Sequence, residues 1–177
     1  MAGDCGHDHG LLRFYRQSGI AELAAALLRP DLPPDEPDFA QLATTIPPWA
    51  HRPSGPYADG ISPPVQAGQP ETFSILAGAW LTDHAGPDRG NLWIWPGTHL
   101  GFGAHPPIDL GEPVQVIGEA GSVLFAHHLL AHNVGGYDAP AGTPIRLVIY
   151  YRLRAHGYQA RRREAVACPL AEFRAAA

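Results

Sequence analysis

The chain has 177 residues and a hydrophobic content of 45%, which suffices for one globular domain with a packed core. Its formal net charge of −5 argues against a nucleic-acid partner, because binding to phosphates needs a basic face. No apolar run approaches the length of a membrane span, and two cysteines without a secretory leader favour a reducing compartment. We therefore expect a cytoplasmic protein that binds neither nucleic acid nor a membrane.

The first 40 residues are expected to form a tail, one short helix and a linker ahead of a larger domain at residues 41–177. Apolar side chains in residues 11–28 recur at intervals of three and four, which is the spacing of one helical face. Arg29-Pro30 ends this pattern, because proline cannot continue a helix. Residues 30–39 are rich in proline and acidic side chains and are predicted to be the linker.

The larger domain is predicted to be mainly β. With 20 glycines and 19 prolines, long helices cannot dominate the fold, and many turns are required. Residues 51–70 have no periodicity and are expected to be one long loop. Short strands are predicted at residues 41–46, 72–82, 92–95, 114–117, 123–125 and 145–153. One short N-terminal helix followed by such strands favours a double-sheet jelly roll.

The segment from residue 121 to residue 153 carries the chemistry that stands out most. His132 follows a predicted strand, and a loop rich in Gly, Ala and Pro leads to the next one. In that strand Arg146, Val148, Tyr150 and Arg152 share one face, because side chains alternate along a strand. A histidine and an arginine brought into one cavity suit a metal ligand beside a carboxylate clamp.

Two motifs resemble those of the phytanoyl-CoA dioxygenase family. One is the GNLWIWPGTH stretch at residues 90–99; the other is GSVLFAHHLLAHNVGG at residues 121–136, with Arg146 and a Tyr-Tyr-Arg sequence downstream. The resemblance spans about residues 41–151. The family fold is a double-stranded β-helix, a form of jelly roll. Its members mostly use Fe(II), 2-oxoglutarate and O2 to oxidise small molecules.

The resemblance implies roles for individual residues. His132 matches the distal iron-binding histidine, and Asp59 matches the carboxylate of the family's HxDG motif. Arg146 matches the arginine that pairs with the far carboxylate of 2-oxoglutarate. Trp80 and Gln41 stand where the family often has residues close to this cosubstrate. The remaining histidines are expected to be structural at positions 99, 127 and 128, and exposed in loops at positions 84 and 105.

The chain departs from the family at position 57, where Tyr57 replaces the first metal-binding histidine. A phenol binds Fe(II) less well than imidazole does, because it must first lose a proton with a pKa near ~10. Three alternatives remain open. Tyr57 ligates the metal with altered chemistry, His51 in the same loop replaces the missing ligand, or the metal site is lost and the fold is retained.

Three functions follow from these alternatives. The first is an Fe(II)/2-oxoglutarate-dependent dioxygenase acting on a small organic molecule by hydroxylation or a related oxidation. The second is a metal-independent isomerase, cyclase or lyase, with Tyr57 and His132 moving protons. The third is a non-catalytic binding protein or subunit. We also expect the protein to form a homo-oligomer or a complex with a homologous enzyme.

Overall fold

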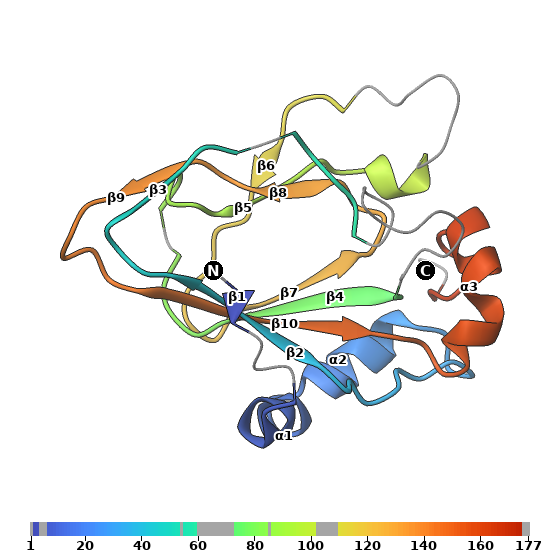
Figure 1. Ribbon diagram of the computed structural model, residues 1–177. Coiled ribbons are helices and arrows are strands. Elements are labelled where there is room, and N and C mark those ends of the chain that lie inside the picture. The colour runs from blue at the N-terminus through green and yellow to red at the C-terminus, as the bar shows by residue number, and fades with distance from the viewer. Residues whose placement is uncertain are drawn as a thin grey trace.

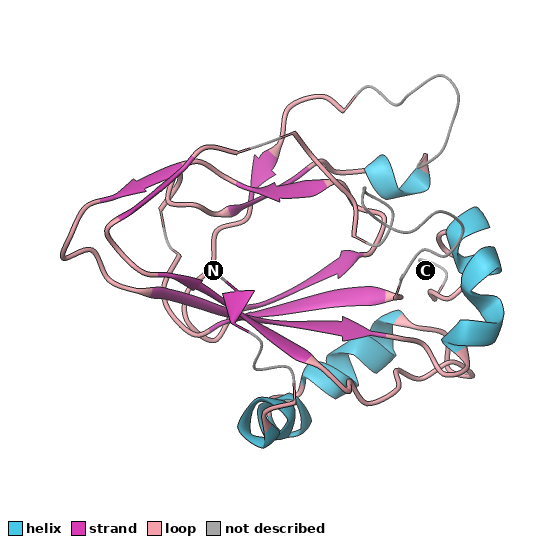
Figure 2. Cartoon of the chain, in the orientation of Figure 1, coloured by secondary structure: helices cyan, strands magenta, loops and turns pink. Residues whose placement is uncertain are grey.

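Two layers of β-strands face each other in this protein, with helices at one side and at the C-terminus (Figure 1). The computed structural model describes residues 2–3, 7–53, 55–59, 73–84, 86–101 and 110–174. The fold is mainly β, as the strand pattern predicts, and loops connect most of the short strands (Figure 2). Much of the predicted loop at residues 51–70, and position 105, lie outside the described residues.

Two helices, rather than the predicted one, precede the sheets. Helix α1 spans His9–Gln17 and α2 spans Ile20–Leu27. The Asp8 side chain caps α1 by accepting hydrogen bonds from the backbone N–H groups of Gly10 and Leu11. The expectation of one continuous helix is wrong because Gly19 adopts a φ of 78°, a left-handed conformation that interrupts the helical hydrogen bonding.

The larger sheet has the strand order β1-β2-β10-β4-β7 and is antiparallel throughout. Its strands are β1 (Ala2–Gly3), β2 (Ala40–Thr45), β10 (Arg146–Leu153), β4 (Ile75–Trp80) and β7 (Val123–His127). Strand β10 lies in the middle, and Tyr150 is paired with Gln41 on one side and Gly78 on the other. The predicted strands that correspond to β2, β4, β7 and β10 are therefore confirmed with slightly different bounds.

The two faces of this sheet have different surroundings. Alternate residues of β10, namely Ile149, Tyr151 and Leu153, join residues of α1, α2 and β4 in the main hydrophobic core. The opposite face of β10 presents Arg146, Tyr150 and Arg152 toward the second layer, as alternation requires. The helices therefore cover the outside of the sheet and leave its polar face for the interior of the barrel.

The second layer consists of two small sheets. One has the order β6-β5-β8 and the other pairs β3 with β9. The bounds are β3 Trp49–His51, β5 Leu92–Ile94, β6 Val114–Gln115, β8 His132–Val134 and β9 Tyr137–Ala139. Strands β3, β8 and β9 lie in segments for which the sequence predicts no strand. Tyr57 extends this layer through an isolated antiparallel bridge to His132.

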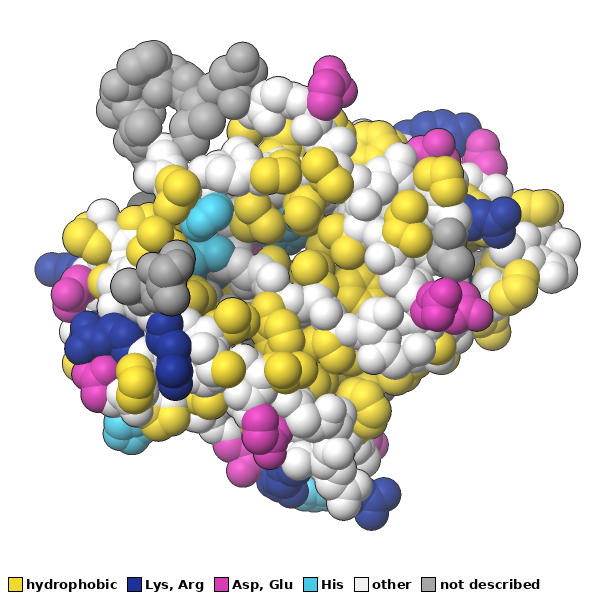
Figure 3. Space-filling view, turned by 180° about the vertical axis from the view of Figure 1, so that it is seen from behind, with side chains coloured by type: hydrophobic (Ala, Val, Ile, Leu, Met, Phe, Trp, Pro, Cys, Tyr) yellow, Lys and Arg dark blue, Asp and Glu magenta, His cyan; other side chains and the backbone are white. Residues whose placement is uncertain are grey.

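A short 3-10 helix, η1 (Thr98–Leu100), follows β5, and helix α3 (Tyr158–Ala167) closes the chain after β10. Among the described residues no helix combines the length and apolar character of a membrane span. Seen from behind, the molecule shows hydrophobic side chains across its middle, with arginines and acidic side chains interspersed near the margins (Figure 3). This face therefore presents no continuous basic surface.

Candidate functional site

His132 presents one ring nitrogen to the interior of the barrel. The side chain is 8% exposed, and its Nδ1 lies 2.8 Å from the carbonyl oxygen of Leu130. A carbonyl can only accept a hydrogen bond, so Nδ1 carries the proton and Nε2 of the neutral ring carries a lone pair. This is the orientation that a metal-binding histidine takes when a backbone carbonyl fixes its tautomer.

Asp59 lies across from that lone pair. Its Oδ1 is 3.9 Å from Nε2 of His132, and its Oδ2 is 3.6 Å from Nη2 of Arg152. Two ligands that each lie about 2.1 Å from one ion are at most ~4.2 Å apart, so Oδ1 and Nε2 are close enough to belong to one ligand set and would hold a metal ion after a small mutual approach. Arg152 holds the other carboxylate oxygen and thereby turns Oδ1 toward the histidine.

Tyr57 occupies the place of the expected first histidine. Its backbone exchanges hydrogen bonds of 3.0 and 2.9 Å with His132, and the two ring centroids are 4.6 Å apart. The side chain is 38% exposed. Partial burial and the charge of Asp59 raise the pKa of the Tyr57 hydroxyl, with a smaller opposing effect from Arg152. Tyr57 therefore remains a neutral phenol next to two conventional ligands.

His51 does not replace the missing ligand. It ends β3, where its ring stacks on Trp49 with the centroids 5.1 Å apart and its Nε2 lies 3.2 Å from the carbonyl oxygen of Val134. In the described part of the chain no three His, Cys, Asp or Glu side chains gather closely enough to hold a metal. The alternative that placed His51 with Asp59 and His132 is therefore wrong, and the site offers two such ligands beside a tyrosine.

Arg146, at the start of β10, is a buried cation without an acidic partner among the described residues. It is 6% exposed, and its Nη2 donates to Nδ1 of His84, while Nε and Nη1 have no hydrogen-bond partner within the described chain. The Tyr137 ring lies 5.7 Å from its guanidinium carbon. Burial lowers the pKa of Arg146, but an arginine stays charged. A buried charge with unused donors requires an anion.

Trp80 and His84 add two donors to the same cluster. His84 accepts from Arg146 through Nδ1, so its Nε2 carries the proton, and neither this group nor Nε1 of Trp80 has a partner within the described chain. The two rings meet edge to face with centroids 6.0 Å apart. Desolvation, and next the charge of Arg146, lower the pKa of His84 to about 4. Three neighbouring side chains therefore offer only donors, which fits a ligand rich in oxygen acceptors such as a dicarboxylate.

The expectation that His84 is an exposed loop residue is wrong, because the side chain is 6% exposed. Its sequence position next to a polar turn gives no sign of burial. The only feature of the sequence that indicates burial of His84 is its proximity to Trp80, which ends a buried strand.

Gln41, which the resemblance places near the cosubstrate, lies beside Arg152 and not beside Arg146. Its Oε1 accepts a hydrogen bond of 3.0 Å from Nη1 of Arg152, whereas Arg146 is paired with Thr45 at the other end of β2. Tyr150 lies between the two arginines on β10, and burial, followed by the effect of Tyr57, raises its pKa to about 12. The interior thus has one group of polar side chains that includes Asp59 and Arg152, and a second group around Arg146.

Comparisons with solved structures identify the fold. The chain is similar to AviO1 from Streptomyces viridochromogenes Tue57, with 22% identity, a TM-score of 0.56, and coverage of 82% of this chain and 61% of AviO1. It is similar to EvdMO1, with 24% identity, a TM-score of 0.54, and coverage of 76% and 30%. HygX from Streptomyces hygroscopicus, solved with nickel and 2-oxoglutarate bound, has 15% identity, a TM-score of 0.51, and coverage of 81% and 67%.

The protein therefore shares the fold of these solved structures, a double-stranded β-helix, as its motifs predict. No family model matches the sequence, and no curated protein does. The chain spans less than two thirds of the length of EvdMO1 and of AviO1.

Proposed function

We propose that this protein is an Fe(II)/2-oxoglutarate-dependent oxygenase that acts on a small organic molecule. The observation that carries the proposal is the buried donor cluster of Arg146, His84 and Trp80, in which the remaining N–H groups have no acceptor within the described chain. Such a cluster is costly to maintain unless a ligand supplies the acceptors. The far carboxylate of 2-oxoglutarate has the charge and the oxygen atoms that these donors need.

The metal-ligand end supports the same proposal. Nε2 of His132 and Oδ1 of Asp59 would hold the iron, and Arg152 would keep the Asp59 carboxylate in its orientation. Bound iron would supply the oxidation chemistry, with 2-oxoglutarate and O2 as co-reactants. Iron in this class of site usually has three protein ligands, and His132 and Asp59 would supply two of them.

Tyr57 takes a different role from the histidine that it replaces. Its raised pKa keeps the hydroxyl protonated, so it donates a hydrogen bond instead of binding iron as a phenolate. Because the side chain is partly exposed, this hydroxyl is accessible to a substrate that approaches the Asp59 end. We assign Tyr57 to orientation of an oxygen atom of the substrate or of a metal-bound ligand.

Partnership and location remain predictions. We expect a small-molecule substrate, self-association or association with a longer homologous enzyme, and a cytoplasmic location.

The proposal is tested by incubating the purified protein with Fe(II), 2-oxoglutarate and O2 and measuring succinate. We expect slow succinate formation without substrate, which stops on chelation of iron and falls at least tenfold in Arg146→Gln. Arg163→Gln, at an exposed position of α3, serves as the matched control and should behave as wild type. Absence of both iron uptake and succinate would contradict the proposal.

A further inference from the structure

Strand β7 forms one edge of the larger sheet, and no described strand pairs with its free side (Figure 1). On its other side it pairs with β4, where the N–H of Trp80 donates to the carbonyl oxygen of Ser122 over 3.0 Å. Backbone groups of successive residues in an antiparallel strand point to opposite sides. The N–H and C=O groups of Leu124 therefore face β4, whereas those of Val123 and Phe125 point away from the sheet.

This edge lacks the features that usually keep edge strands from associating. Strand β7 contains no proline, no acidic residue, no lysine and no arginine. Burial lowers the pKa of His127 to about 4, so the strand is uncharged at neutral pH. All of its side chains are only half-buried, and Val114 and Ile117 in the segment that leads to it are 51% and 53% exposed. An uncharged, apolar edge is a template for pairing with another strand.

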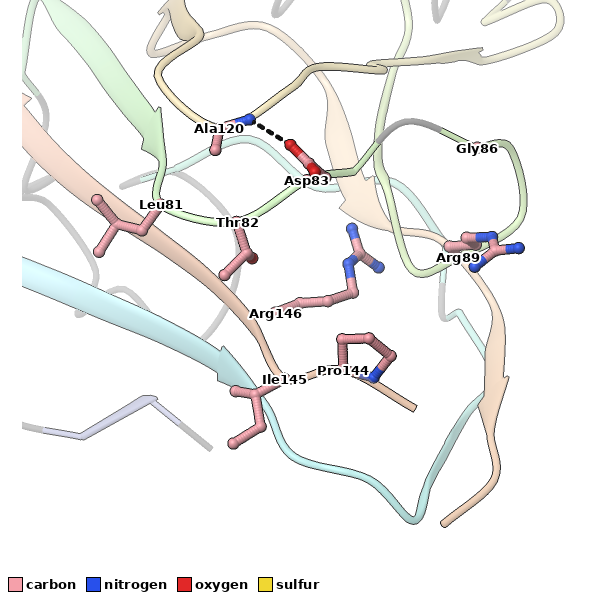
Figure 4. Close-up of a pocket in the computed structure, with 9 residues that line it drawn as sticks. All are labelled: Leu81, Thr82, Asp83, Gly86, Arg89, Ala120, Pro144, Ile145 and Arg146. Carbon is pink, nitrogen blue, oxygen red and sulfur yellow. Dashed lines mark hydrogen bonds between the residues drawn. The ribbon is translucent and has the colours of Figure 1, made fainter. Parts of the chain in front are cut away.

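The strand is held in place at both ends. In the turn before it, the backbone N–H of Ala120 donates a hydrogen bond of 2.8 Å to the carboxylate of Asp83 (Figure 4). At its other end, Nε2 of His127 donates over 2.8 Å to the carbonyl oxygen of Pro169. Between these anchors Phe125 packs against the main hydrophobic core. A strand fixed in this way loses little conformational freedom when it pairs, which favours association.

We propose that β7 pairs in antiparallel orientation with β7 of a second copy of this chain, so that the two larger sheets become one continuous sheet. A two-fold axis at Phe125 places this residue opposite itself and Val123 opposite His127 of the other copy. The outward N–H and C=O groups then meet and form about four hydrogen bonds. Because the strand is uncharged, pairing with itself brings no like charges together.

The charges beyond the two ends of β7 also favour a second copy as the partner. Glu119 is exposed in the turn before the strand. Helix α3, with three arginines and one acidic residue, leads into Pro169 at the opposite end. Antiparallel pairing therefore brings the acidic turn of each copy toward the basic helix of the other. Opposite charges placed in this way favour this orientation and speed association.

Val123→Pro tests the pairing at the backbone. Proline removes the N–H of Val123, which points away from β4, and so leaves the hydrogen bonds between β4 and β7 in place. Val123→Ala is the matched control, because it shortens the side chain but keeps the N–H. We expect wild type and Val123→Ala to dimerise in sedimentation equilibrium, and the dissociation constant of the dimer to rise about tenfold or more in Val123→Pro.

A wild type that stays monomeric up to ~100 µM would overturn the proposal, whatever other protein binds the edge, since at this concentration a specific dimer forms. A dimer that Val123→Pro leaves equally tight would overturn it as well, because its interface must lie elsewhere. Circular dichroism shows whether the variant folds.

If Val123→Pro does not fold, amide hydrogen exchange of the wild type decides. Pairing protects the outward N–H of Phe125, so its exchange should slow about tenfold or more between ~1 µM and ~100 µM protein. Exchange that is independent of concentration would exclude the paired edge. Neither measurement needs iron or 2-oxoglutarate, so the result is independent of the proposed function.

Discussion

Tyr57 stands where the related motif has a histidine, and its surroundings define what it can do. The ring packs against His132, and the carboxylate of Asp59 disfavours ionisation of the phenol. In the proposed site, a residue in this setting would contribute a hydrogen-bond donor and leave metal binding to His132 and Asp59. Whether Tyr57 acts as a hydrogen-bond donor or as a metal ligand therefore depends on its pKa as much as on its distance from His132 and Asp59.

Replacement of Tyr57 by histidine should strengthen the metal site. Tyr57→His supplies a neutral nitrogen donor beside Nε2 of His132 and Oδ1 of Asp59, which completes two histidines and one carboxylate. We expect Fe(II) affinity, measured by anaerobic titration calorimetry, to rise at least tenfold, or about 1.4 kcal/mol. Tyr57→Phe is the control, because it removes the hydroxyl without adding a donor. Equal affinities of wild type and Tyr57→His would show that position 57 does not face the metal.

Arg146 should reduce the stability of the unliganded protein while it makes binding possible. A buried cation without an anion destabilises the folded state, and its removal from such a site can be stabilising. We expect Arg146→Gln to raise the free energy of unfolding by about 1 kcal/mol and to weaken 2-oxoglutarate binding by roughly 30-fold, or ~2 kcal/mol. Chemical denaturation and calorimetry measure the two effects. A less stable variant with unchanged binding would contradict this account.

Individual site residues could be predicted from sequence only where a motif names them. His132, Asp59 and Arg146 follow from their motifs, and the structure places the first two close together. His84 and Tyr150 could not be found in this way, because their importance arises from contacts between segments far apart in the chain. His84 meets Arg146 across 62 residues.

At the level of elements, strand β10 organises the interior. Its pairing with β2 and β4 fixes which side chains face inward, and its alternation places Arg146, Tyr150 and Arg152 in one line. This alternation was predictable from residues 145–153 alone. The short strands β3 and β9 were not, because three residues such as Trp49–His51 are too few to show a periodicity. The break between α1 and α2 depends on one glycine within a continuous apolar pattern.

His127, which ends β7, and the neighbouring His128 should make the folded state sensitive to acid. Burial, with an opposing hydrogen bond to Pro169, lowers the pKa of His127 to about 4, and burial followed by the effect of His127 lowers that of His128 to about 3. Unfolded histidine titrates near ~6.5, so below this pH the unfolded chain binds more protons than the folded one. The stability that the neutral forms of these two histidines contribute is therefore fully present above pH ~6.5. It decreases as the pH falls toward their pKa values in the folded state.

We expect the midpoint of urea denaturation to decrease between pH 7 and pH 5. His128→Phe retains a ring of similar size against Phe73 and His127 but cannot take up a proton. Its denaturation midpoint should depend less on pH over the same interval. Identical midpoints of the wild type at pH 7 and pH 5 would be inconsistent with the lowered pKa values.

At the level of the whole molecule, the fold could be predicted from the sequence more readily than the cavities that the folded chain forms. Gly- and Pro-rich spacing, short strands and two motifs indicated a double-stranded β-helix, and comparisons with solved structures agree. The sequence could not show that a cavity forms beside the start of β10, because that depends on how the turns around Ala120 and Asp83 pack together.

The central claim is that one barrel interior holds iron at His132 and Asp59 and 2-oxoglutarate at Arg146. An anaerobic titration with Fe(II) and 2-oxoglutarate tests it directly, because chelation of Fe(II) by a 2-keto acid gives a visible charge-transfer absorption. We predict that this band develops in the wild type, is lost in His132→Ala, and requires much higher 2-oxoglutarate in Arg146→Gln. A wild type without the band, under conditions in which Tyr57→His shows it, would contradict the claim.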